Sequence, residues 1–326
     1  MKLGILGTGM IVKDLLKTID EIHIDAISIL GTQQTKDETQ QLVKQYQLDQ
    51  AFYDYDMMLK SDIDTVYVAL PNHLHYSFSK KAIEAGKHVI IEKPITSNVK
   101  ELQDLIKIAD EKNLMIFEAM NIHYLPSYRS LKENLSKVGK VKVVNFNYSQ
   151  YSSRYDAFKE GNILPAFDYH KSGGALMDIH VYNIHAIMGL FQTPINNYYF
   201  ANVEKNIDTS GMMVYDYGMF KAVSIGAKDC QAPVVSTIQG DQGVIVIHKP
   251  VNQMMKYSYI DNNAQQIDYD FNEGKHRLFY EFMEFKRMID EKDYQGQQEM
   301  LSLSLEISKV MEKARQQQNI IFDADK

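Results

Sequence analysis

The stretch KLGILGTGMIV, residues 2–12, decides the fold of the N-terminal half of the chain. An apolar run of strand length ends at Gly7-Thr8-Gly9, and residues 11–19 then place apolar side chains at the three- and four-residue steps of a helix. A Gly-x-Gly turn between a strand and a helix lets the backbone approach a pyrophosphate. Val12 replaces the third glycine of this fingerprint, a position that governs packing more than phosphate contact. A tight turn without a ligand is the alternative.

The same alternation continues to about residue 120. Further strand-length runs are found at 24–30, 65–70, 88–91 and 114–117, and segments of helical period lie at 37–46, 75–85 and 99–112. Strand, helix, strand is typical of a parallel sheet, because parallel neighbours need a crossover connection. The runs are apolar on both faces, which indicates that helices cover both. The sequence predicts a doubly wound α/β domain.

The second half has a different pattern. Runs of period two occur at 141–150, 197–203, 211–221, 222–227, 234–239, 243–248 and 255–260. Most are joined by short links, as antiparallel strands are. A predicted helix at 174–189 interrupts them, and the last 50 residues read as two amphipathic helices with a short apolar end. This half is predicted to be an α+β domain.

Composition narrows the class of protein. A chain of 326 residues is long enough for two domains, and its 45% hydrophobic and 24% charged residues are typical of a folded protein. The net charge of −7 argues against a nucleic-acid-binding surface. The one cysteine, Cys230, excludes an intrachain disulfide. Without a secretory pattern or an apolar run of about 18 residues, we expect a cytoplasmic protein with no membrane partner.

A second stretch points to chemistry. The apolar run His88–Ile91 leads without a polar buffer into Glu92, Lys93 and Pro94. Ligands of an open parallel sheet bind outside the carboxyl ends of its strands, and a proline ends the strand there. The two charges are therefore predicted to lie at the mouth of a cofactor crevice.

Several motifs now occur in a specific combination that covers essentially the whole chain. They are Pro71-Asn72-x-x-His75, Ala85-Gly86-Lys87-His88-Val89, Glu92-Lys93-Pro94, Glu118-Ala119-Met120, the run Gly173-Gly174-Ala175-Leu176-Met177-Asp178, and the C-terminal helices around 276–290 and 300–315. In this combination the sequence resembles the Gfo/Idh/MocA oxidoreductases, a family named for glucose-fructose oxidoreductase and inositol dehydrogenase.

The resemblance implies the domain organisation. An N-terminal Rossmann dinucleotide-binding domain is expected at residues 1–120 and an α+β domain at 121–326. The second domain of such proteins has a mainly antiparallel, open-faced sheet, binds the substrate and often makes the oligomer contact. A homodimer or homotetramer through this sheet is therefore expected.

The resemblance and the glycine turn together imply a set of cofactor-binding residues. These are Gly7, Thr8, Gly9, Met10, Ile11, Thr32, Leu70, Pro71, Asn72, His75, Glu92 and Lys93. The cofactor is NAD or NADP. The second strand ends at residues 29–34 without an acid to bind the ribose hydroxyls or repel a 2′-phosphate, and Thr32 with Lys36 could contact such a phosphate. The sequence leans to NADP.

Oxidation of a secondary alcohol by nicotinamide releases a hydroxyl proton that a base must accept. The resemblance implies that Lys93 lies by the nicotinamide and the substrate, and that the acid/base is found four residues after Asp178, at Tyr182. Members like inositol dehydrogenase have histidine at this place, whereas members like dihydrodiol and sugar dehydrogenases have tyrosine. Lys93 and Tyr182 are the predicted catalytic residues.

These residue types can work together physically. Asp178 and Tyr182 are four residues apart and so share one face of an α-helix. A free phenol is a poor base at neutral pH, and an ammonium within about 4 to 6 Å favours the phenolate. Our hypothesis is that Lys93 supplies this charge, that Glu92 orients Lys93, and that Asp178 bonds a substrate hydroxyl.

Two positions depart from the family pattern near Tyr182. His180 stands where members with tyrosine usually have glycine and could narrow the pocket. His185 lies about one helical turn after Tyr182, so it either touches substrate or is packed. A metal site built from His170, Asp178, His180 and His185 is not expected, because His180 and His185 point to different faces of a helix.

A third departure follows Glu118. Relatives commonly read Glu-Ala-x-x-x-Arg, and the arginine position here is His123. An imidazole cannot supply a bidentate fork, so no anionic substrate is inferred. His123, Asn121 and Tyr124 are candidates to line the pocket, together with His185 and Asp178.

The sequence thus predicts an NAD(P)-dependent oxidoreductase that acts on a secondary alcohol or ketone of a sugar, polyol or diol. Two alternatives remain: a regulatory protein that binds nucleotide without turnover, and a sugar-processing enzyme that holds NAD tightly and performs no net redox reaction. Retention of both Lys93 and Tyr182 favours the enzyme, since a sensor needs neither group at the nicotinamide.

Overall fold

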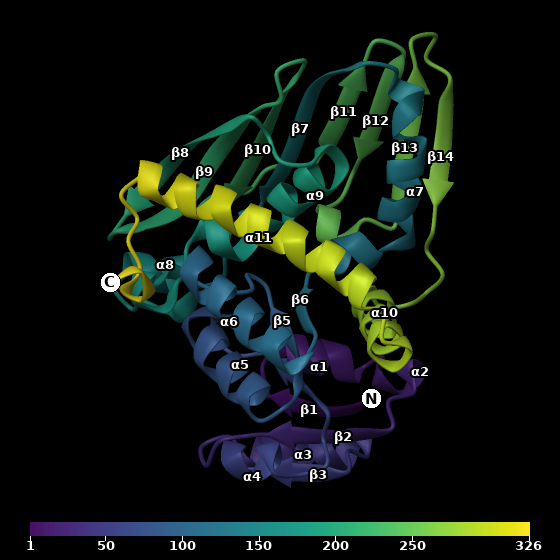
Figure 1. Ribbon diagram of the computed structural model, residues 1–326. Coiled ribbons are helices and arrows are strands. Elements are labelled where there is room, and N and C mark those ends of the chain that lie inside the picture. The colour runs from purple at the N-terminus through teal and green to yellow at the C-terminus, as the bar shows by residue number, and fades with distance from the viewer. The chain divides into compact units, whose positions relative to one another are not determined.

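The computed structural model describes residues 1–326 and contains two sheets (Figure 1). Contacts divide the chain into two compact units: unit 1 is Met1–Ala119 with Leu278–Leu305, and unit 2 is Met120–Arg277 with Glu306–Lys326. The expected second domain, 121–326, differs from unit 2 because the segment 278–305 packs in unit 1. An apolar helix face returns to the first sheet, and sequence order does not reveal such a return.

Unit 1 contains a six-stranded parallel sheet with the order β3-β2-β1-β4-β5-β6. Its strands are β1 (Lys2–Leu6), β2 (Ala26–Leu30), β3 (Gln50–Phe52), β4 (Thr65–Val68), β5 (His88–Glu92) and β6 (Ile116–Ala119). Because β1 lies between β2 and β4, the strand order reverses there, which is where an open α/β sheet binds its ligand. The doubly wound prediction is confirmed.

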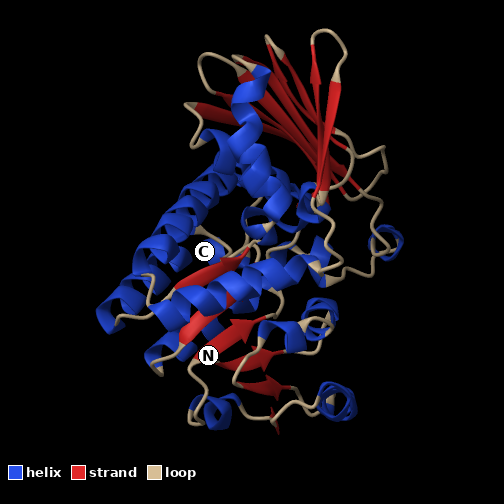
Figure 2. Cartoon of the chain, turned by 90° about the vertical axis from the view of Figure 1, so that its right-hand side faces the viewer, coloured by secondary structure: helices blue, strands red, loops and turns tan.

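Helices flank both faces of this sheet (Figure 2). They are α1 (Met10–Leu16), α2 (Ile19–Ile22), α3 (Lys36–Tyr46), α4 (Tyr55–Leu59), α5 (His75–Glu84) and α6 (Val99–Lys112), with a 3-10 turn η1 (Asn72–Leu74). Strands β1, β4 and β5 are buried almost throughout, as their continuous apolar runs predict.

Two C-terminal helices complete the chain, α10 (Arg277–Glu291) and α11 (Tyr294–Gln317). On α10, the ring of Phe282 lies edge-on to Tyr67 at 5.0 Å, and Phe285 packs on Phe117 at 4.9 Å. These rings explain why the helix belongs to unit 1, since aromatic burial of this kind contributes a large hydrophobic area.

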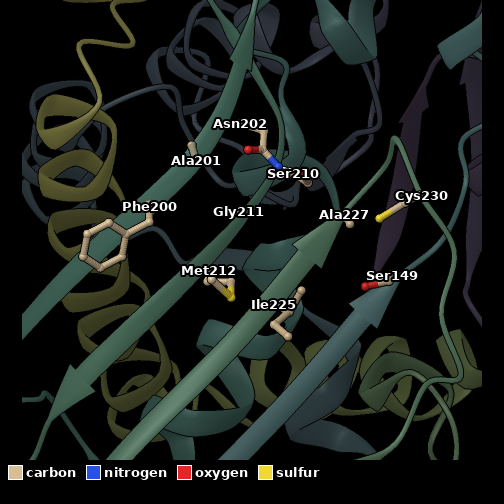
Figure 3. Close-up of a pocket in the computed structure, with 10 residues that line it drawn as sticks. All are labelled: Ser149, Phe200, Ala201, Asn202, Ser210, Gly211, Met212, Ile225, Ala227 and Cys230. Atoms are coloured by element: carbon tan, nitrogen blue, oxygen red, sulfur yellow. Dashed lines mark hydrogen bonds between the residues drawn. The ribbon is translucent and has the colours of Figure 1, made fainter.

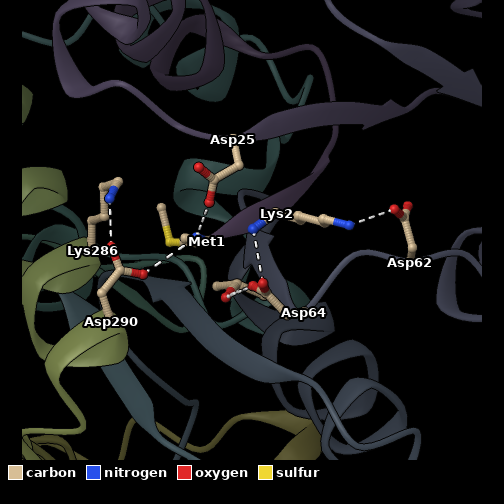
Figure 4. Close-up of polar contacts among 8 residues, drawn as sticks. Met1, Lys2, Asp25, Asp62, Asp64, Lys286 and Asp290 are labelled. Atoms are coloured by element: carbon tan, nitrogen blue, oxygen red, sulfur yellow. Dashed lines mark hydrogen bonds and ion pairs between the residues drawn. The ribbon is translucent and has the colours of Figure 1, made fainter.

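Polar contacts at the start of β1 also hold α10 in unit 1 (Figure 4). The Met1 amino group pairs with Asp25 and, at 3.3 Å, with Asp290 of α10, which also pairs with Lys286. The backbone N–H of Lys2 donates to Asp64 at 3.0 Å. The N-terminal residue and helix α10 therefore meet beside one strand.

Unit 2 contains an eight-stranded sheet with the order β14-β13-β12-β11-β7-β10-β9-β8. Its strands are β7 (Val141–Ser149), β8 (Asn196–Glu204), β9 (Ile207–Asp216), β10 (Lys221–Ala227), β11 (Ser236–Gly240), β12 (Gly243–Ile247), β13 (Lys256–Asp261) and β14 (Gln266–Asp270). All neighbours are antiparallel except β7 and β10. The predicted mainly antiparallel sheet is confirmed.

Helices lie on one face of this sheet (Figure 1). They include α7 (Pro126–Asn134) and α9 (Val181–Phe191). Unit 2 also contains α8 (Tyr155–Lys159) and the 3-10 turns η2 (Asn121–Tyr124), η3 (Leu135–Val138), η4 (Pro165–Phe167), η5 (Tyr169–Lys171), η7 (Val251–Gln253) and η8 (Asp323–Asp325). The segment η6 (Leu176–His180) is a π-helix that runs into α9. The predicted helix at 174–189 is thus not α-helical throughout.

The other face of the sheet is open. Phe200, Met212 and Ile225 project from neighbouring strands on this face (Figure 3), and the side chains of Phe200 and Met212 are exposed by 60% and 49%. A cavity of about 320 Å³ lies among them and is also lined by Cys230, whose thiol is unpaired with another cysteine.

The edge strand β8 is protected by the end of α11 and the residue after it. The amide side chain of Gln317 accepts from Tyr199 N–H at 2.7 Å and donates to Asn197 O at 2.9 Å, and Gln318 donates to Tyr199 O at 2.6 Å. These bonds satisfy backbone groups that an edge strand otherwise presents to another chain.

Among all the helices of the structure, none combines the length and the apolar character needed to cross a bilayer.

Candidate active site

The glycine turn after β1 has the geometry of a phosphate cradle. Gly7 has φ +99°, a left-handed conformation that favours glycine, and a Cβ there would lie 3.0 Å from Ala69 O. Gly9 is the N-cap of α1, and a Cβ added to it would meet nothing within 4 Å. Next to it, the side chain of Met10 is 72% exposed. The open space above a helix N-terminus fits a dinucleotide pyrophosphate held by Gly7, Thr8 and Gly9.

The end of β2 carries no acid, as the sequence shows, but a carboxylate from α3 reaches the glycine turn. Glu38, in the first turn of α3, accepts from Thr8 Oγ1 at 2.7 Å, and Lys13 pairs with the other oxygen of the same carboxylate. The hydrogen bond from Lys13 lowers the pKa of Glu38, with a further contribution from Thr8. A carboxylate does lie at the glycine turn, and the charge of Lys13 balances it.

The residues predicted to contact a 2′-phosphate are held by local contacts. Thr32 Oγ1 lies 3.2 Å from Thr35 Oγ1, and Thr32 N–H donates to the same Thr35 oxygen at 2.9 Å. The Lys36 ammonium lies 5.9 Å from the centroid of the Tyr53 ring. Both side chains are close to the end of β2, where the adenosine ribose is bound in this fold.

The turn that carries Lys93 is held from behind by buried groups. Glu92, the last residue of β5, is buried and accepts from the Tyr67 hydroxyl and from Lys93 N–H at 3.3 Å. Glu118 at the end of β6 accepts from Ile95 N–H at 3.1 Å. The carboxylates of two neighbouring strands therefore fix the backbone on both sides of the Lys93–Pro94 bond.

His75 links this turn to the end of β4. Its ring is fully buried, with Nδ1 2.9 Å from Pro94 O and Nε2 2.7 Å from Leu70 O. Burial lowers the pKa of the imidazole, so one ring nitrogen carries the proton and donates. His75 was predicted to bind cofactor, which stays a prediction; in the structure its buried ring contacts the carbonyl oxygens of Leu70 and Pro94.

In unit 2, the Gly-Gly motif begins the segment that carries Asp178 and Tyr182. A Cβ on Gly173 would lie 2.5 Å from Pro165 O, and Gly174 has φ +102° with a Cβ position that overlaps the Asp208 carboxylate. Asp208 is buried and accepts from Leu176 N–H at 2.6 Å and from the Tyr199 hydroxyl at 2.8 Å. Only glycine lets this chain segment approach the buried carboxylate, whose pKa is raised by burial.

Asp178 lies within the π-helical segment, and Tyr182 is the second residue of α9. The wider turn replaces the regular α-helical spacing that was predicted for the pair, and such turns are frequent at functional sites. The Tyr182 ring is 7% exposed and packs on Tyr148 at a centroid distance of 6.1 Å. An ion pair that was not predicted joins Asp178 to Lys228, with 2.7 Å between Oδ2 and Nζ.

The histidines around this helix are packed. His180 is fully buried, its Nε2 lies 2.6 Å from Ser224 Oγ, and burial lowers its pKa to about 3. It faces the sheet and does not narrow an open pocket, because its Cβ packs on Gly226. His185, 1% exposed, places Nδ1 3.1 Å from Nε2 of His123. His185 is therefore packed in this structure, and its contact with a substrate stays a prediction.

The remaining pocket candidates lie in η2. Asn121 is buried and donates to Asn252 O at 2.8 Å, and Tyr124 is also buried. Burial, followed by the neighbouring His185, lowers the pKa of His123 well below its usual range, so this ring is a neutral group where relatives carry arginine. Across the structure, no group of three or more His, Cys, Asp and Glu side chains is arranged to hold a metal ion.

The residues that hold the site were not all visible in the sequence. Asp208, Ser224 and Lys228 come from β9, β10 and the residue after β10, and no motif marks them. Tyr67 and Glu38 were likewise missed. Only Lys228 carried a sequence signal that could have indicated a functional position: it is a charged residue directly after the predicted strand at 222–227.

Unit 1 has a glycine cradle at the point where the strand order of its parallel sheet reverses, and a lysine turn at the end of β5. This is the arrangement of a dinucleotide-binding unit. The family model described as "Oxidoreductase family, NAD-binding Rossmann fold" (GFO_IDH_MocA) matches residues 1–120. The chain is 33% identical to scyllo-inositol 2-dehydrogenase (NADP(+)) IolU of Bacillus subtilis, over 100% of this chain and 99% of that protein. It belongs to the Gfo/Idh/MocA oxidoreductase family.

Two more comparisons agree with this assignment. D-xylose 1-dehydrogenase (NADP(+)) 2 of Haloferax volcanii is 27% identical over 67% of each chain. The crystal structure of KijD10, a 3-ketoreductase from Actinomadura kijaniata in complex with NADP and TDP-benzene, superposes with a TM-score of 0.83 at 19% identity and covers 99% of both chains. At that identity the structural likeness supports the fold alone.

Proposed function

We propose that this protein is an NADP-preferring oxidoreductase that transfers a hydride between nicotinamide and a secondary alcohol or ketone of a sugar, polyol or diol. The observation that carries the proposal is the Lys93 turn: Glu92, Glu118 and His75 fix it at the carboxyl end of the parallel sheet that bears the glycine cradle. A buried scaffold of this kind is expected where an ammonium must be held in position for chemistry.

Relatives support the substrate class and the cofactor. The named proteins most similar in sequence include dehydrogenases of scyllo-inositol, D-xylose and trans-1,2-dihydrobenzene-1,2-diol, and two of these names specify NADP(+). The balanced Glu38–Lys13 pair at the glycine turn is compatible with a 2′-phosphate, since no uncompensated carboxylate opposes it.

We assign the proton chemistry to Tyr182. A bound dinucleotide supplies hydride acceptance at its nicotinamide ring. In the oxidation direction the Tyr182 phenolate accepts the substrate hydroxyl proton while the carbon–hydrogen bond gives up its electron pair as hydride; in reduction the phenol returns the proton. We propose that Lys93 assists the reaction through its positive charge and that Asp178 accepts a hydrogen bond from a second substrate hydroxyl.

A turnover screen tests the function. Sugars, polyols and diols are incubated with NAD or NADP, and the nicotinamide absorbance is followed. We expect turnover of at least one hydroxylated compound, faster with NADP, and a loss of kcat on the order of 10²- to 10⁴-fold in Tyr182→Phe, because general acid–base catalysis contributes that much.

Tyr294→Phe, which removes the hydroxyl of an exposed tyrosine in unit 1, serves as the control. If a compound is turned over and Tyr182→Phe keeps the full rate at neutral pH, the proton-transfer assignment is wrong. Tight nucleotide binding without any turnover would favour the regulatory alternative instead.

The remaining proposals concern assembly and location. The exposed Tyr198, Phe200 and Met212 on the open sheet face support a homodimer or homotetramer built through that face, because monomers rarely leave such patches uncovered. Light scattering of wild type and Phe200→Glu measures it, with a smaller particle expected for the variant. We also propose a cytoplasmic location, in keeping with the single cysteine, and cell fractionation tests it.

A further inference from the structure

We propose that Lys228 is a positioning residue of this enzyme: it holds the Asp178 carboxylate in the orientation in which that carboxylate receives a substrate hydroxyl. The inference rests on the proposed function, because it assumes that Asp178 binds substrate. It adds a residue outside every sequence motif, located directly after β10.

The contacts of Lys228 are those of a buried structural cation. Its side chain is 2% exposed, and its ammonium lies 2.7 Å from Asp178 Oδ2 and donates to Ala166 O at 2.6 Å. The ring of Phe167 lies beneath it, with 4.2 Å between Nζ and the ring centroid. A charge this deeply buried persists only when it is paired and hydrogen-bonded, and these contacts meet that requirement.

The partner carboxylate has a different environment. The Asp178 side chain is 34% exposed, so it is anchored on the side of Lys228 and accessible on another. A carboxylate paired with an ammonium offers acceptor oxygens, and an acceptor is what recognition of a substrate hydroxyl requires. The low exposure of Lys228 excludes direct contact with a substrate and assigns it an indirect role.

Lys228 also ties Asp178 to the Gly-Gly turn. The carbonyl of Ala166, which accepts from Lys228 Nζ, also accepts from Gly174 N–H at 3.1 Å. The backbone of Lys228 is fixed in turn, because its N–H donates to Thr209 O at 2.9 Å and its carbonyl accepts from Ser152 N–H at 2.8 Å. One rigid ammonium thus sets the position of Asp178 relative to the turn on which the π-helical segment begins.

Lys228→Met tests this role, because the methionine keeps the apolar stem against Phe167 and leaves a partly exposed Asp178 that water can solvate. We expect the KM for the alcohol to rise on the order of 10- to 100-fold, as displacement of a binding group by about 1 Å does, with the KM for NADP unchanged. Lys205→Met is the matched control, since Lys205 also lies over a phenylalanine ring and donates to a backbone carbonyl but pairs with no carboxylate.

A double-mutant cycle with Asp178→Asn separates positioning from a general structural effect. If Lys228 acts through Asp178, Lys228→Met adds nothing to the KM of the Asp178→Asn protein. The inference is overturned if Lys228→Met raises the KM for the alcohol equally in the wild-type and the Asp178→Asn proteins. It is also overturned if that KM stays within twofold of wild type, or if the KM for NADP rises in parallel.

Measurements on the wild-type protein in the same experiment show whether this inference or the proposed function has failed. If wild type binds a screened compound without turning it over, the function proposed above is wrong, and the affinity for that compound then takes the place of KM in the cycle. If wild type with NADP neither binds nor converts any hydroxylated compound, both proposals are overturned.

Discussion

The Lys93 turn of unit 1 and the Asp178–Tyr182 helix of unit 2 are held in place by different means. The turn is fixed by Glu92 at the end of β5, by Glu118 on the neighbouring strand β6, and by His75, the first residue of α5. The helix is anchored by residues of another sheet that come 32 to 44 positions later in the chain, Asp208 at Leu176 and Ser224 at His180. In unit 1, Lys93 and the residues that hold it thus lie in the motifs that the sequence shows. In unit 2, the functional residues lie in a motif, but the residues that anchor them lie elsewhere in the chain.

The difference indicates which property a substitution in each unit should change. Anchors of the turn bind backbone groups: Glu92 and Glu118 accept from N–H groups, and the His75 ring contacts the Pro94 carbonyl, so they control the path of the main chain at Lys93. Anchors of the helix include side chain to side chain contacts, such as Lys228 with Asp178, so they control individual functional groups. Substitutions in the first set are expected to affect the rate, and substitutions in the second to affect substrate affinity or stability.

The largest expected effect is that of Lys93→Met. Removing the ammonium from the turn should lower kcat on the order of 10²-fold or more while NADP still binds, because a charge that assists proton transfer is lost and the glycine cradle is intact. Steady-state kinetics and a fluorescence titration of NADP measure the two quantities. Lys100→Met, an exposed lysine of α6, is the control, and a Lys93→Met protein with more than a tenth of wild-type kcat contradicts the assignment.

A smaller effect is expected when an anchor of the turn is removed. Glu118→Ala leaves Ile95 N–H without its carboxylate acceptor in a buried place. We expect a roughly 10-fold lower kcat and a free energy of unfolding lower by about 1–3 kcal/mol, the usual cost of a buried group that loses its partner. Urea unfolding and kinetics check both, with exposed Glu111→Ala as the control. Loss of stability with an unchanged kcat would show that the turn does not need this anchor.

The smallest effect concerns pH and the helix of unit 2. His180 has a folded-state pKa of about 3 because it is buried, whereas an unfolded histidine titrates near 6.5. Its folded-state pKa is depressed, so its contribution to stability is complete above pH 6.5 and is lost progressively as the pH falls toward 3. Between pH 7 and pH 5 the loss is about 2 kcal/mol.

His180→Gln should therefore lose less stability than wild type over this interval, as measured by urea unfolding at both pH values. His248→Gln, at an exposed position, should follow the wild-type curve. If wild type and His180→Gln lose the same amount, His180 is protonated or exposed in the folded protein, and the comparison between the two anchored regions loses this element.

Much of the fold could be predicted because its signals are local. The parallel strands and the crossover helices of unit 1 each carry their own period, and so do most strands of unit 2. The short β3 and α4 were missed because three to five residues give no period, and β14 because its side chains are mostly exposed. The placement of α10 in unit 1 depends on rings such as Phe282 meeting Tyr67, and a helical period does not say which sheet it will meet.

The sequence by itself determined the Rossmann unit and the glycine turn, because these depend on neighbouring residues whose spacing is fixed by the backbone, and its resemblance to the family implied Lys93, Asp178 and Tyr182 as candidate groups. Only the tertiary structure decided that Lys13 balances Glu38, that His185 is packed on His123, and that Lys228 holds Asp178. Such pairs form where distant segments bury polar groups together, and the free energy that selects them depends on desolvation and distance in three dimensions, which no local pattern of residues records.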